Sequence, residues 1–530
     1  MKAFTAWAAL LAAASAAAGP ETPDRPAPAE SAPTLYERPG EPEPAGRLDE
    51  LVFARLKARG IRPSRLCSDA VFVRRVHLDL TGTLPTAAEA RAFLADTRPD
   101  RRRKLIDELM AREAFADYWA MRWGDVLRIK SEFPINLWPN AVQAYHRWVR
   151  TAMREDLPLD RFARELLTSS GSNFRVPPVN FYRATQSAAP EALAKAVALT
   201  FLGDRMDSWP AARKAGLAVF FSRVGYKRTA EWKEEIVFFD RSTKAAASAV
   251  LPDGTTATLA PDRDPRAAFA DWLLAPGNPR FARCMVNRLW FWLLGRGLIH
   301  EPDDVRPDNP PAHPDVLALL ARELVASKYD ARHVMRLILN STTYQLSSVP
   351  RSRRPEAAAL FARCRLRRLD AEVLIDAICR ISGTAESYSS QVPEPFTWVP
   401  ERRRTIALDD GSITSSFLDM FGRPPRDTGM ASERTNAVTA AQRLHLLNSS
   451  HLREKIERGP KLRRLRLKAA RNPRQAIAEL YLTVLSRYPT AEELRTIKAF
   501  SDEAKGRRGG NVLVDVTWAL VNSPEFLYRH

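Results

Sequence analysis

Acidic side chains and one histidine gather in a proline-rich loop, where their types suit metal chemistry. The acids are Asp303, Asp304, Asp308 and Asp315, and the histidine is His313. Carboxylates accept a hard cation such as calcium, and an imidazole could complete a transition-metal site. The spacing matches neither an EF-hand nor a zinc motif, and Asp315 also stands where an acid favours the start of a helix. The loop therefore offers a candidate metal site (Asp303, Asp304, Asp308 and His313), in which Asp304 and His313 would be catalytic in a metal-assisted hydrolase.

A second candidate site lies in residues 72–82, where polar residues alternate with apolar ones. His77 and Asp79 stand two positions apart and would form a general-base pair if a nucleophile approached them. The alternative interpretation is that these residues, with Arg74 and Arg75, form buried ion pairs that fix a helix to its neighbour. The sequence favours this structural interpretation.

Arginines elsewhere are candidates for binding. A guanidinium is a planar fork that can hold a carboxylate or two carbonyls at once. Tyr182 with Arg183, and Asn287 with Arg288, predict such ties across the two halves of the chain. The candidate binding residues are Arg183, Arg288, Arg296 and Arg434.

The sequence lacks the short motifs of several large enzyme classes. It has no Gly-x-Ser-x-Gly elbow, zincin motif, phosphate-binding loop or dinucleotide fingerprint. Residues 169–172 form a polar turn and not a nucleophile elbow. Phosphoryl transfer and α/β-hydrolase chemistry are therefore disfavoured.

The chain that positions these residues is long and has a globular composition. It has 530 residues, of which 45% are hydrophobic and 27% charged, so it can bury sizeable cores. This composition excludes a collagen-like chain and disfavours a polytopic membrane protein. The formal net charge of +19 suits an anionic partner such as a sulfated glycan. The densest basic stretch, residues 461–474, predicts a helix with a basic face but carries no nucleic-acid-binding signature, so nucleic acid is not the expected partner.

The first 46 residues predict export. Lys2 precedes a short apolar run, and Ala16-Ala17-Ala18-Gly19 offers a small-residue cleavage site, as in a secretory signal peptide at residues 1–18. The alternative is an uncleaved anchor, and no other transmembrane span is predicted. Residues 19–46 are rich in proline and predict a disordered linker. The expected location is periplasmic or extracellular.

Apolar residues recur every three or four positions from residue 47 onward, which predicts a mainly α fold. Residues 236–239 form a strand-like run, and residues 249–259 predict a hairpin around Pro252-Asp253-Gly254. We therefore predict two helical domains, residues 47–235 and 263–530, separated by a small β insert at residues 236–262. Residues 302–314 and 382–404 are predicted to be long loops.

A helix–cap–helix module occurs near both ends of this folded part. Pro85-Thr86-x-x-Glu89 is similar to Pro489-Thr490-x-x-Glu493. In each copy the threonine and the glutamate predict a capping box at a helix start. The repetition predicts that the two ends share a structural role and pack together.

The four cysteines form no Cys-x-x-Cys pair and no Cys/His metal spacing. One or two disulfides could form in an oxidising compartment, with a pairing that the sequence does not predict. Cys364 and Cys379 stand in apolar helical contexts typical of buried thiols.

Many of these segments, taken in order, resemble a known family. They are Phe72-Val73-Arg74-Arg75-Val76-His77-Leu78-Asp79-Leu80-Thr81-Gly82, Asn180-Phe181-Tyr182-Arg183-Ala184, Val286-Asn287-Arg288-Leu289-Trp290, Gly295-Arg296-Gly297-Leu298, Ser341-Thr342-Thr343-Tyr344-Gln345, Arg368-Leu369-Asp370-Ala371-Glu372 and Gln442-Arg443-Leu444-His445-Leu446-Leu447-Asn448. The set resembles secreted, planctomycete-type proteins that pair domain of unknown function 1549, on the amino side, with domain 1553. The resemblance covers nearly everything after residue 47.

The resemblance implies a cytochrome-associated family without an assigned activity. Many members carry a haem-attaching Cys-x-x-Cys-His motif after Phe-Leu-Gly, whereas here residues 204–210 follow Phe201-Leu202-Gly203 without cysteine or histidine. Covalent c-type haem needs both thiols and the imidazole, so the chain resembles a haem-less branch and no cofactor is predicted. Likewise Met430-Ala431-Ser432-Glu433-Arg434 stands where many relatives have a Cys-Glu-Arg element.

The resulting hypothesis is an exported, non-catalytic binding or scaffold protein of the cell envelope. Redox proteins or polysaccharide-processing proteins are the expected partners. Two alternatives remain open: a metal-assisted hydrolase that uses the Asp304/His313 loop, and a polyanion binder that takes a sulfated glycan. The sequence does not decide whether the protein is an enzyme.

Overall fold

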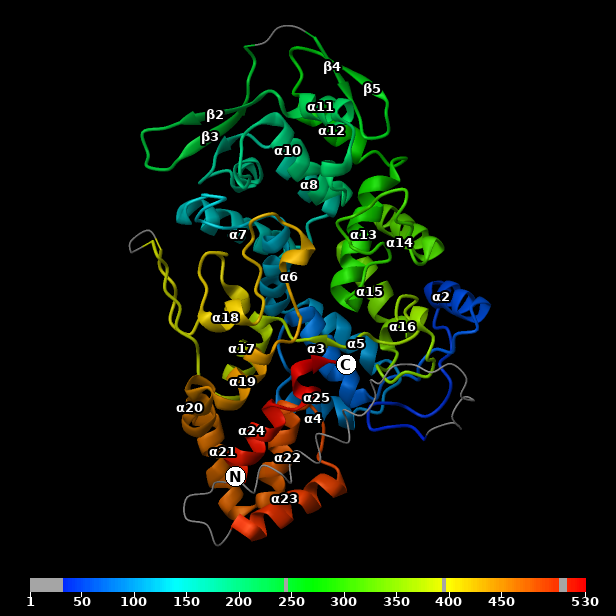
Figure 1. The fold of residues 1–530 in the computed structure, drawn as a ribbon, viewed down its shortest axis with the longest axis vertical. Helices are drawn as coiled ribbons and strands as arrows, with labels where there is room; N and C mark the ends of the chain where they lie inside the picture. Colours follow the sequence, from blue (N-terminus) through cyan, green and yellow to red (C-terminus); the bar gives the residue numbers. More distant parts are fainter. Residues whose placement is uncertain (1–31, 243–245, 393–396, 505–511) are drawn as a thin grey trace. The chain divides into compact units, whose positions relative to one another are not determined.

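The chain is built mainly of α-helices, as the apolar periodicity predicts. The computed structural model describes residues 32–242, 246–392, 397–504 and 512–530. The helices of the first half are α2 (Arg47–Ala58), α3 (Asp69–Thr81), α4 (Ala87–Ala95), α5 (Arg101–Met110), α6 (Glu113–Val126), α7 (Pro139–Arg154), α8 (Leu159–Thr168), α9 (Asn180–Arg183), α10 (Pro190–Val197) and α11 (Ala211–Ala218) (Figure 1).

The second half is also helical. Its helices are α12 (Pro265–Leu273), α13 (Pro279–Leu294), α14 (Pro314–Ala326), α15 (Ala331–Leu339), α16 (Thr342–Gln345), α17 (Ala371–Ser382), α18 (Ser416–Met420), α19 (Ala440–Asn448), α20 (Ser450–Arg458), α21 (Pro460–Arg471), α22 (Pro473–Val484), α23 (Ala491–Ala504), α24 (Val512–Val521) and α25 (Pro524–Leu527). Residues Tyr36–His530 form one compact unit.

Strands are few and short. They are β1 (Gly171–Ser172), β2 (Val224–Arg228), β3 (Glu235–Phe239), β4 (Ala247–Val250), β5 (Thr256–Leu259), β6 (Arg367–Arg368) and β7 (Tyr528–Arg529). All pairings are antiparallel, in the orders β1-β3-β2, β4-β5 and β6-β7.

The predicted β insert is confirmed at β3, β4 and β5, but β2 lies before its predicted start. Val224 of β2 pairs with Phe239 of β3. Gly225 makes this pairing close, because a Cβ at that position would lie 2.6 Å from the Phe238 ring. A strand with a glycine at its second residue gives little period-two signal, and so the sequence does not reveal it.

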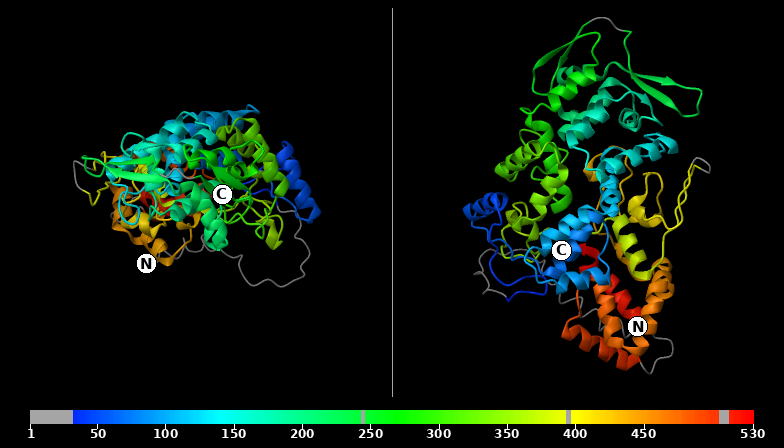
Figure 2. Two further views of the ribbon diagram at one scale, coloured as in Figure 1. Left: turned by 90° about the horizontal axis from the view of Figure 1, so that it is seen from above. Right: turned by 180° about the vertical axis from the view of Figure 1, so that it is seen from behind.

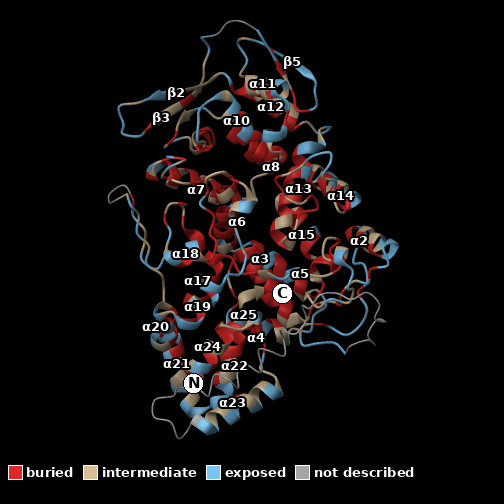
Figure 3. Ribbon diagram, in the orientation of Figure 1, coloured by how far each residue is buried: buried red, intermediate tan, exposed pale blue. Residues whose placement is uncertain are grey.

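Helices α3 and α6 are the centre of the core (Figure 3). Every α3 residue from Val71 to Thr81 is buried, including its charged ones. The Ser68 hydroxyl accepts a hydrogen bond from the Val71 amide at the start of α3. Gly82 ends the helix at φ 59°, where a Cβ would lie 2.5 Å from the Tyr118 ring of α6. A helix buried on all sides suits a central position between both ends of the chain.

The two repeated modules form capping boxes and pack against each other, which confirms the prediction from the repeat. Thr86 caps α4 with Glu89, and Thr490 exchanges the same two hydrogen bonds with Glu493. Arg74 of α3 donates to the carbonyls of Val484 and Phe526, both at 2.7 Å. Helix α4 contacts α22, and α25 lies beside α3 in the views of Figures 1 and 2.

The predicted disordered linker is wrong for residues 36–46, which pack on the folded chain. The amide of Arg38 donates to the Leu66 carbonyl at 2.8 Å, and the amide of Ser68 donates to the Tyr36 carbonyl at 2.9 Å. The Glu37 carboxylate is buried 3.9 Å from Arg65. These pairings give a proline-rich segment the backbone partners that its composition does not predict. The predicted signal peptide, residues 1–18, lies outside the described residues.

The cysteines of the described residues form no disulfide. Cys67, Cys284, Cys364 and Cys379, all within the described residues, are free thiols. Cys379 is buried as predicted and Cys364 only half-buried, and burial raises the pKa of Cys379 to about 11. No helix in the described ranges combines the length and the apolarity that crossing a bilayer requires.

Candidate functional site

A buried cluster of arginines and carboxylates joins the two ends of the chain. Asp370, just before α17, accepts hydrogen bonds from Arg122 at 2.5 Å and from Arg529 at 2.7 Å. Arg529 also donates to Asp79 at 2.8 Å. The Tyr118 hydroxyl accepts from both arginines, at 2.7 Å from Arg122 and 3.0 Å from Arg529.

The cluster continues around Arg434, one of the candidate binding residues. Arg434 binds both oxygens of Glu372, at 2.7 and 2.9 Å. Its guanidinium also donates to Asp125 at 2.8 Å, and Arg426 donates to the other oxygen of Asp125 at 3.0 Å. Arg434 lies 3.9 Å from Asp370, so the two groups form one ionic network.

The network keeps Glu372 and Asp370 ionised. Burial by itself would raise the pKa of Glu372, but Arg434 and Arg423 outweigh it and lower this pKa to about 2. Burial likewise opposes ionisation of Asp370, and Arg122 and Arg529 hold the pKa of Asp370 far below its usual range. Carboxylates held in this way neither donate nor accept protons near neutral pH, so the network stabilises the fold.

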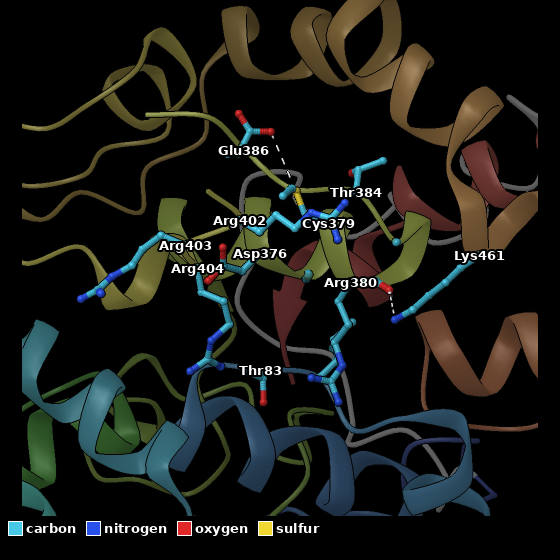
Figure 4. Close-up of a pocket in the computed structure, with 14 residues that line it drawn as sticks. Thr83, Asp376, Cys379, Arg380, Thr384, Glu386, Arg402, Arg403, Arg404 and Lys461 are labelled. Carbon is cyan, nitrogen blue, oxygen red and sulfur yellow. Dashed lines mark hydrogen bonds between the residues drawn. The ribbon is translucent and has the colours of Figure 1, made fainter. Parts of the chain in front are cut away.

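A separate pocket has five cations among its fourteen lining residues (Figure 4). We call it the basic pocket; it has a volume of about 370 Å³. Its cations are Arg380 of α17, Arg402, Arg403 and Arg404 of the loop before residue 405, and Lys461 of α21. Thr83, from the turn between α3 and α4, closes the side that belongs to the first half of the chain.

These cations come together where the end of α17 lies against the start of α21. Gly383 ends α17 at φ 81°, and the Lys461 side chain packs against it, since a Cβ there would lie 2.8 Å from Lys461 Cγ. Lys461 Nζ donates to the Arg380 carbonyl at 2.9 Å. In Figure 4, Arg402 extends toward Cys379 and Thr384.

The two acids of the pocket do not neutralise the cations. Glu386 accepts hydrogen bonds from Lys455 at 2.6 Å and His451 at 2.9 Å, outside the cation set. Asp376 accepts from the amides of Thr405 and Ile406, and burial raises the pKa of Asp376 to about 6.

Two of the five cations pair with acids outside the pocket lining, Arg404 with Asp117 at 2.5 Å and Arg380 with Glu89 at 3.7 Å. The other three form no ion pair with the described residues. Burial, and then the nearby Arg380 and Arg464, lower the pKa of Lys461. A pocket of this size with surplus positive charge can hold an anionic group such as a sulfate ester or a carboxylate.

The loop predicted to bind metal gives each of its residues another contact. Asp303 lies 3.3 Å from Arg288 and accepts from the Ala431 amide at 2.6 Å. Asp304 and Asp308 both face Arg306, at 2.9 and 3.4 Å.

His313 lies apart from these acids. Its Nε2 is 3.2 Å from the Leu360 carbonyl, and burial lowers the pKa of His313 to about 4. No three His, Cys, Asp or Glu side chains of the described residues are grouped as metal ligands. The geometry therefore gives the metal-assisted hydrolase no support.

His77 and Asp79 form hydrogen bonds with different partners. His77 Nδ1 lies 2.8 Å from the Val73 carbonyl, and burial lowers the pKa of His77 to about 4. Asp79 accepts from the Tyr344 hydroxyl at 2.9 Å and from Arg529. These are the contacts of the structural interpretation, and they do not form a general-base pair.

The remaining arginine candidates also differ in their surroundings. Arg183 donates to Glu235 of β3 at 2.9 Å. Arg288 reaches from the second half to the Leu199 carbonyl at 3.2 Å, a tie between halves as predicted. Arg296 lines a second, smaller cavity.

The sequence pointed to parts of the basic pocket but not to the pocket itself. Lys461 opens the densest basic stretch, residues 461–474, and the run Glu401-Arg402-Arg403-Arg404 falls in a predicted loop. Asp376 and Lys461 are 85 positions apart, so only the packing of α17 on α21 places them in one pocket.

Two protein families match successive segments of the chain. Residues 47–209 match the family PSCyt2, described as a protein of unknown function (DUF1549). Residues 265–501 match the family PSD1, described as a protein of unknown function (DUF1553). No curated protein and no solved structure matches the chain. The predicted pairing of these two domains, in this order, is confirmed.

Proposed function

We propose that this chain is an exported, non-catalytic binding protein of the cell envelope that holds anionic groups of a glycan in the basic pocket. The observation that carries the proposal is that three of the pocket's cations, Arg402, Arg403 and Lys461, form no ion pair with the described residues. Asp376 and Glu386 bond to groups outside the cation set. Export rests on the sequence of residues 1–18. The proposal includes no covalent haem, because residues 204–210 contain neither cysteine nor histidine.

The surroundings of the pocket favour a chain-like anion. Helix α21 buries Leu462 and Leu465 and exposes Arg464 and Lys468 along the face that begins at Lys461. A polymer with repeated charges can therefore extend from the pocket along this helix. None of the described residues that line the pocket is aromatic. Single-stranded nucleic acid is bound largely by stacking on aromatics, so the lining favours a sulfated or carboxylated glycan.

Removing two pocket cations tests the proposal. We expect Arg402→Ala with Lys461→Ala to weaken binding of a heparin-type sulfated glycan about tenfold or more, since each lost charge costs roughly 1 kcal/mol in a half-buried site. Isothermal titration calorimetry at 0.1 M salt measures the change.

The matched control is Arg322→Ala with Lys498→Ala, which removes the same charges from exposed positions on α14 and α23. The control should bind as the parent protein does. An equal loss in both double variants would show that net charge, and not the basic pocket, causes binding.

Acidification should strengthen binding at the same pocket. The pKa of Asp376 is about 6, so this carboxyl is ionised at pH 7.5 and mostly neutral at pH 5. Loss of its negative charge should tighten glycan binding by about fivefold as the pH falls, the equivalent of about 1 kcal/mol.

Asp376→Asn provides the control, because it is neutral at every pH. Relative to the parent, this variant should bind more tightly at pH 7.5 and equally at pH 5. A parent and a variant with parallel pH profiles would remove Asp376 from the proposal.

A further inference from the structure

A second cavity, distinct from the basic pocket, lies where the two ends of the chain meet. Six arginines and one acid, Asp79, supply its charged lining. The arginines are Arg75, Arg296, Arg363, Arg365, Arg367 and Arg529. We call this space the arginine cavity.

Asp79, the one acid that the described residues contribute to this lining, already accepts hydrogen bonds from the protein. Asp79 accepts from Arg529 at 2.8 Å and from the Tyr344 hydroxyl at 2.9 Å, and it lies 3.4 Å from Arg367. No acid in the described part of the chain pairs with Arg363 or Arg365. The cavity therefore carries positive charge that the protein does not neutralise.

Three arginines around the cavity each have a buried N–H group without a hydrogen-bond partner. The groups are Arg75 Nη2, Arg296 Nε and Arg367 Nε. The other nitrogens of Arg75 and Arg367 are used, since they donate to the carbonyls of Tyr344 and Leu293. Buried donors are nearly always paired, so these three N–H groups need an acceptor that the described residues do not supply.

Two of the cavity's arginines, Arg296 and Arg367, are destabilised as cations, whereas the pKa values of Arg75 and Arg529, despite burial, are raised by their neighbours. Burial, and then the neighbouring Arg365, lower the pKa of Arg296. Burial also lowers the pKa of Arg367, although Asp79 opposes it. An anion inside the cavity would remove this penalty at both arginines.

The size of the cavity limits what can bind. Its volume is about 20 Å³, and roughly 10–15 Å³ is needed to hold one water-sized occupant. A tetrahedral oxyanion has five atoms and needs several times the room of one water molecule, whereas a monatomic anion is only slightly larger than water. We propose that the arginine cavity binds a single monatomic anion, chloride under ordinary conditions.

Such an ion would join segments that are remote in sequence. Arg75 belongs to α3, Arg296 follows α13, and Arg367 lies on β6, which pairs with β7 near residue 530. Bound chloride would therefore stabilise the contact between the beginning and the end of the folded chain.

Thermal unfolding of the full chain tests the site in solution. We expect Tm to be about 3 °C or more higher in 150 mM sodium chloride or bromide than in sodium gluconate of equal ionic strength. Matching the ionic strength removes general screening. Bromide-soaked crystals should show one anomalous peak in the arginine cavity.

Two variants assign the effect to this cavity. Arg296→Met removes an orphan donor, and Arg365→Met removes an exposed cation from the lining; each should abolish most of the halide-dependent Tm shift. Arg365→Met keeps the test valid if Arg296→Met folds poorly. The double variant Arg402→Ala with Lys461→Ala should keep the full shift, which separates this site from the basic pocket.

Equal Tm values in chloride, bromide and gluconate, or a cavity without an anomalous peak, would overturn the proposal. The second result would mean that water alone satisfies the three N–H groups. A halide shift that survives in both arginine variants would place the responsible ion elsewhere.

Discussion

Replacing Arg529 with methionine should lower the free energy of unfolding by about 3–5 kcal/mol, because it breaks a buried ion pair on one side only. Arg529 is 3% exposed and donates to Asp79 at 2.8 Å and Asp370 at 2.7 Å. Methionine fills similar space but leaves these two carboxylates buried with fewer donors. Urea denaturation followed by tryptophan fluorescence measures the loss.

A surface variant and a rescue variant test the physical reason. Arg263→Met breaks the exposed pair with Asp271 and should change the free energy of unfolding by no more than about 0.5 kcal/mol. Adding Asp79→Asn to Arg529→Met should recover part of the stability, since it removes a stranded charge. A loss below about 1 kcal/mol for Arg529→Met, or no recovery with Asp79→Asn, would contradict the account.

Local patterns predicted much of the fold because they act over a few residues. The helical content follows from apolar residues spaced three and four apart. The boxes at Thr86/Glu89 and Thr490/Glu493 follow from side chains three positions apart that reach each other's amides. The repeat of the module then predicted correctly that the two ends of the chain meet.

The sequence predicted only some members of the ionic network. Arg74, Arg75, His77 and Asp79 were expected to be buried ties, and their contacts are of that kind. Their partners were not foreseen, because Arg529 and Asp79 are 450 positions apart and Arg434 and Asp125 are 309 apart. No periodicity or motif links residues at such separations.

Spatial neighbours that are remote in sequence also decide the contacts of the loop predicted to bind metal. Asp303, Asp304 and His313 are close in sequence, but Arg288 and Arg306 take the two acids while the imidazole turns to a carbonyl. Closeness along the chain predicted a metal site, and in the part of the chain that the structure describes no three such side chains are grouped as metal ligands. The basic pocket shows the reverse, because its cations come from α17, a loop and α21.

Glu372→Gln should destabilise the protein in a pH-dependent way. The pKa of Glu372 is about 2 in the folded protein, against an ordinary value of 4.5, because Arg434 and Arg423 outweigh its burial. A lowered folded-state pKa stabilises the fold at pH values above the unfolded pKa, and this contribution disappears as the pH falls toward the folded pKa. The difference from the parent should therefore be about 3 kcal/mol at pH 7 and less than half of that at pH 3.

Urea denaturation of the parent and the variant at pH 7, 5, 4 and 3 measures this difference. The control is Glu457→Gln, which removes a carboxylate from the exposed pair with Arg453 and should change stability little at any of these pH values. If Glu372→Gln costs the same free energy at pH 7 and pH 3, then Glu372 contributes through its hydrogen bonds and its shape. The charge of the carboxylate would in that case not be what holds Arg434, and through it Asp125, in the network.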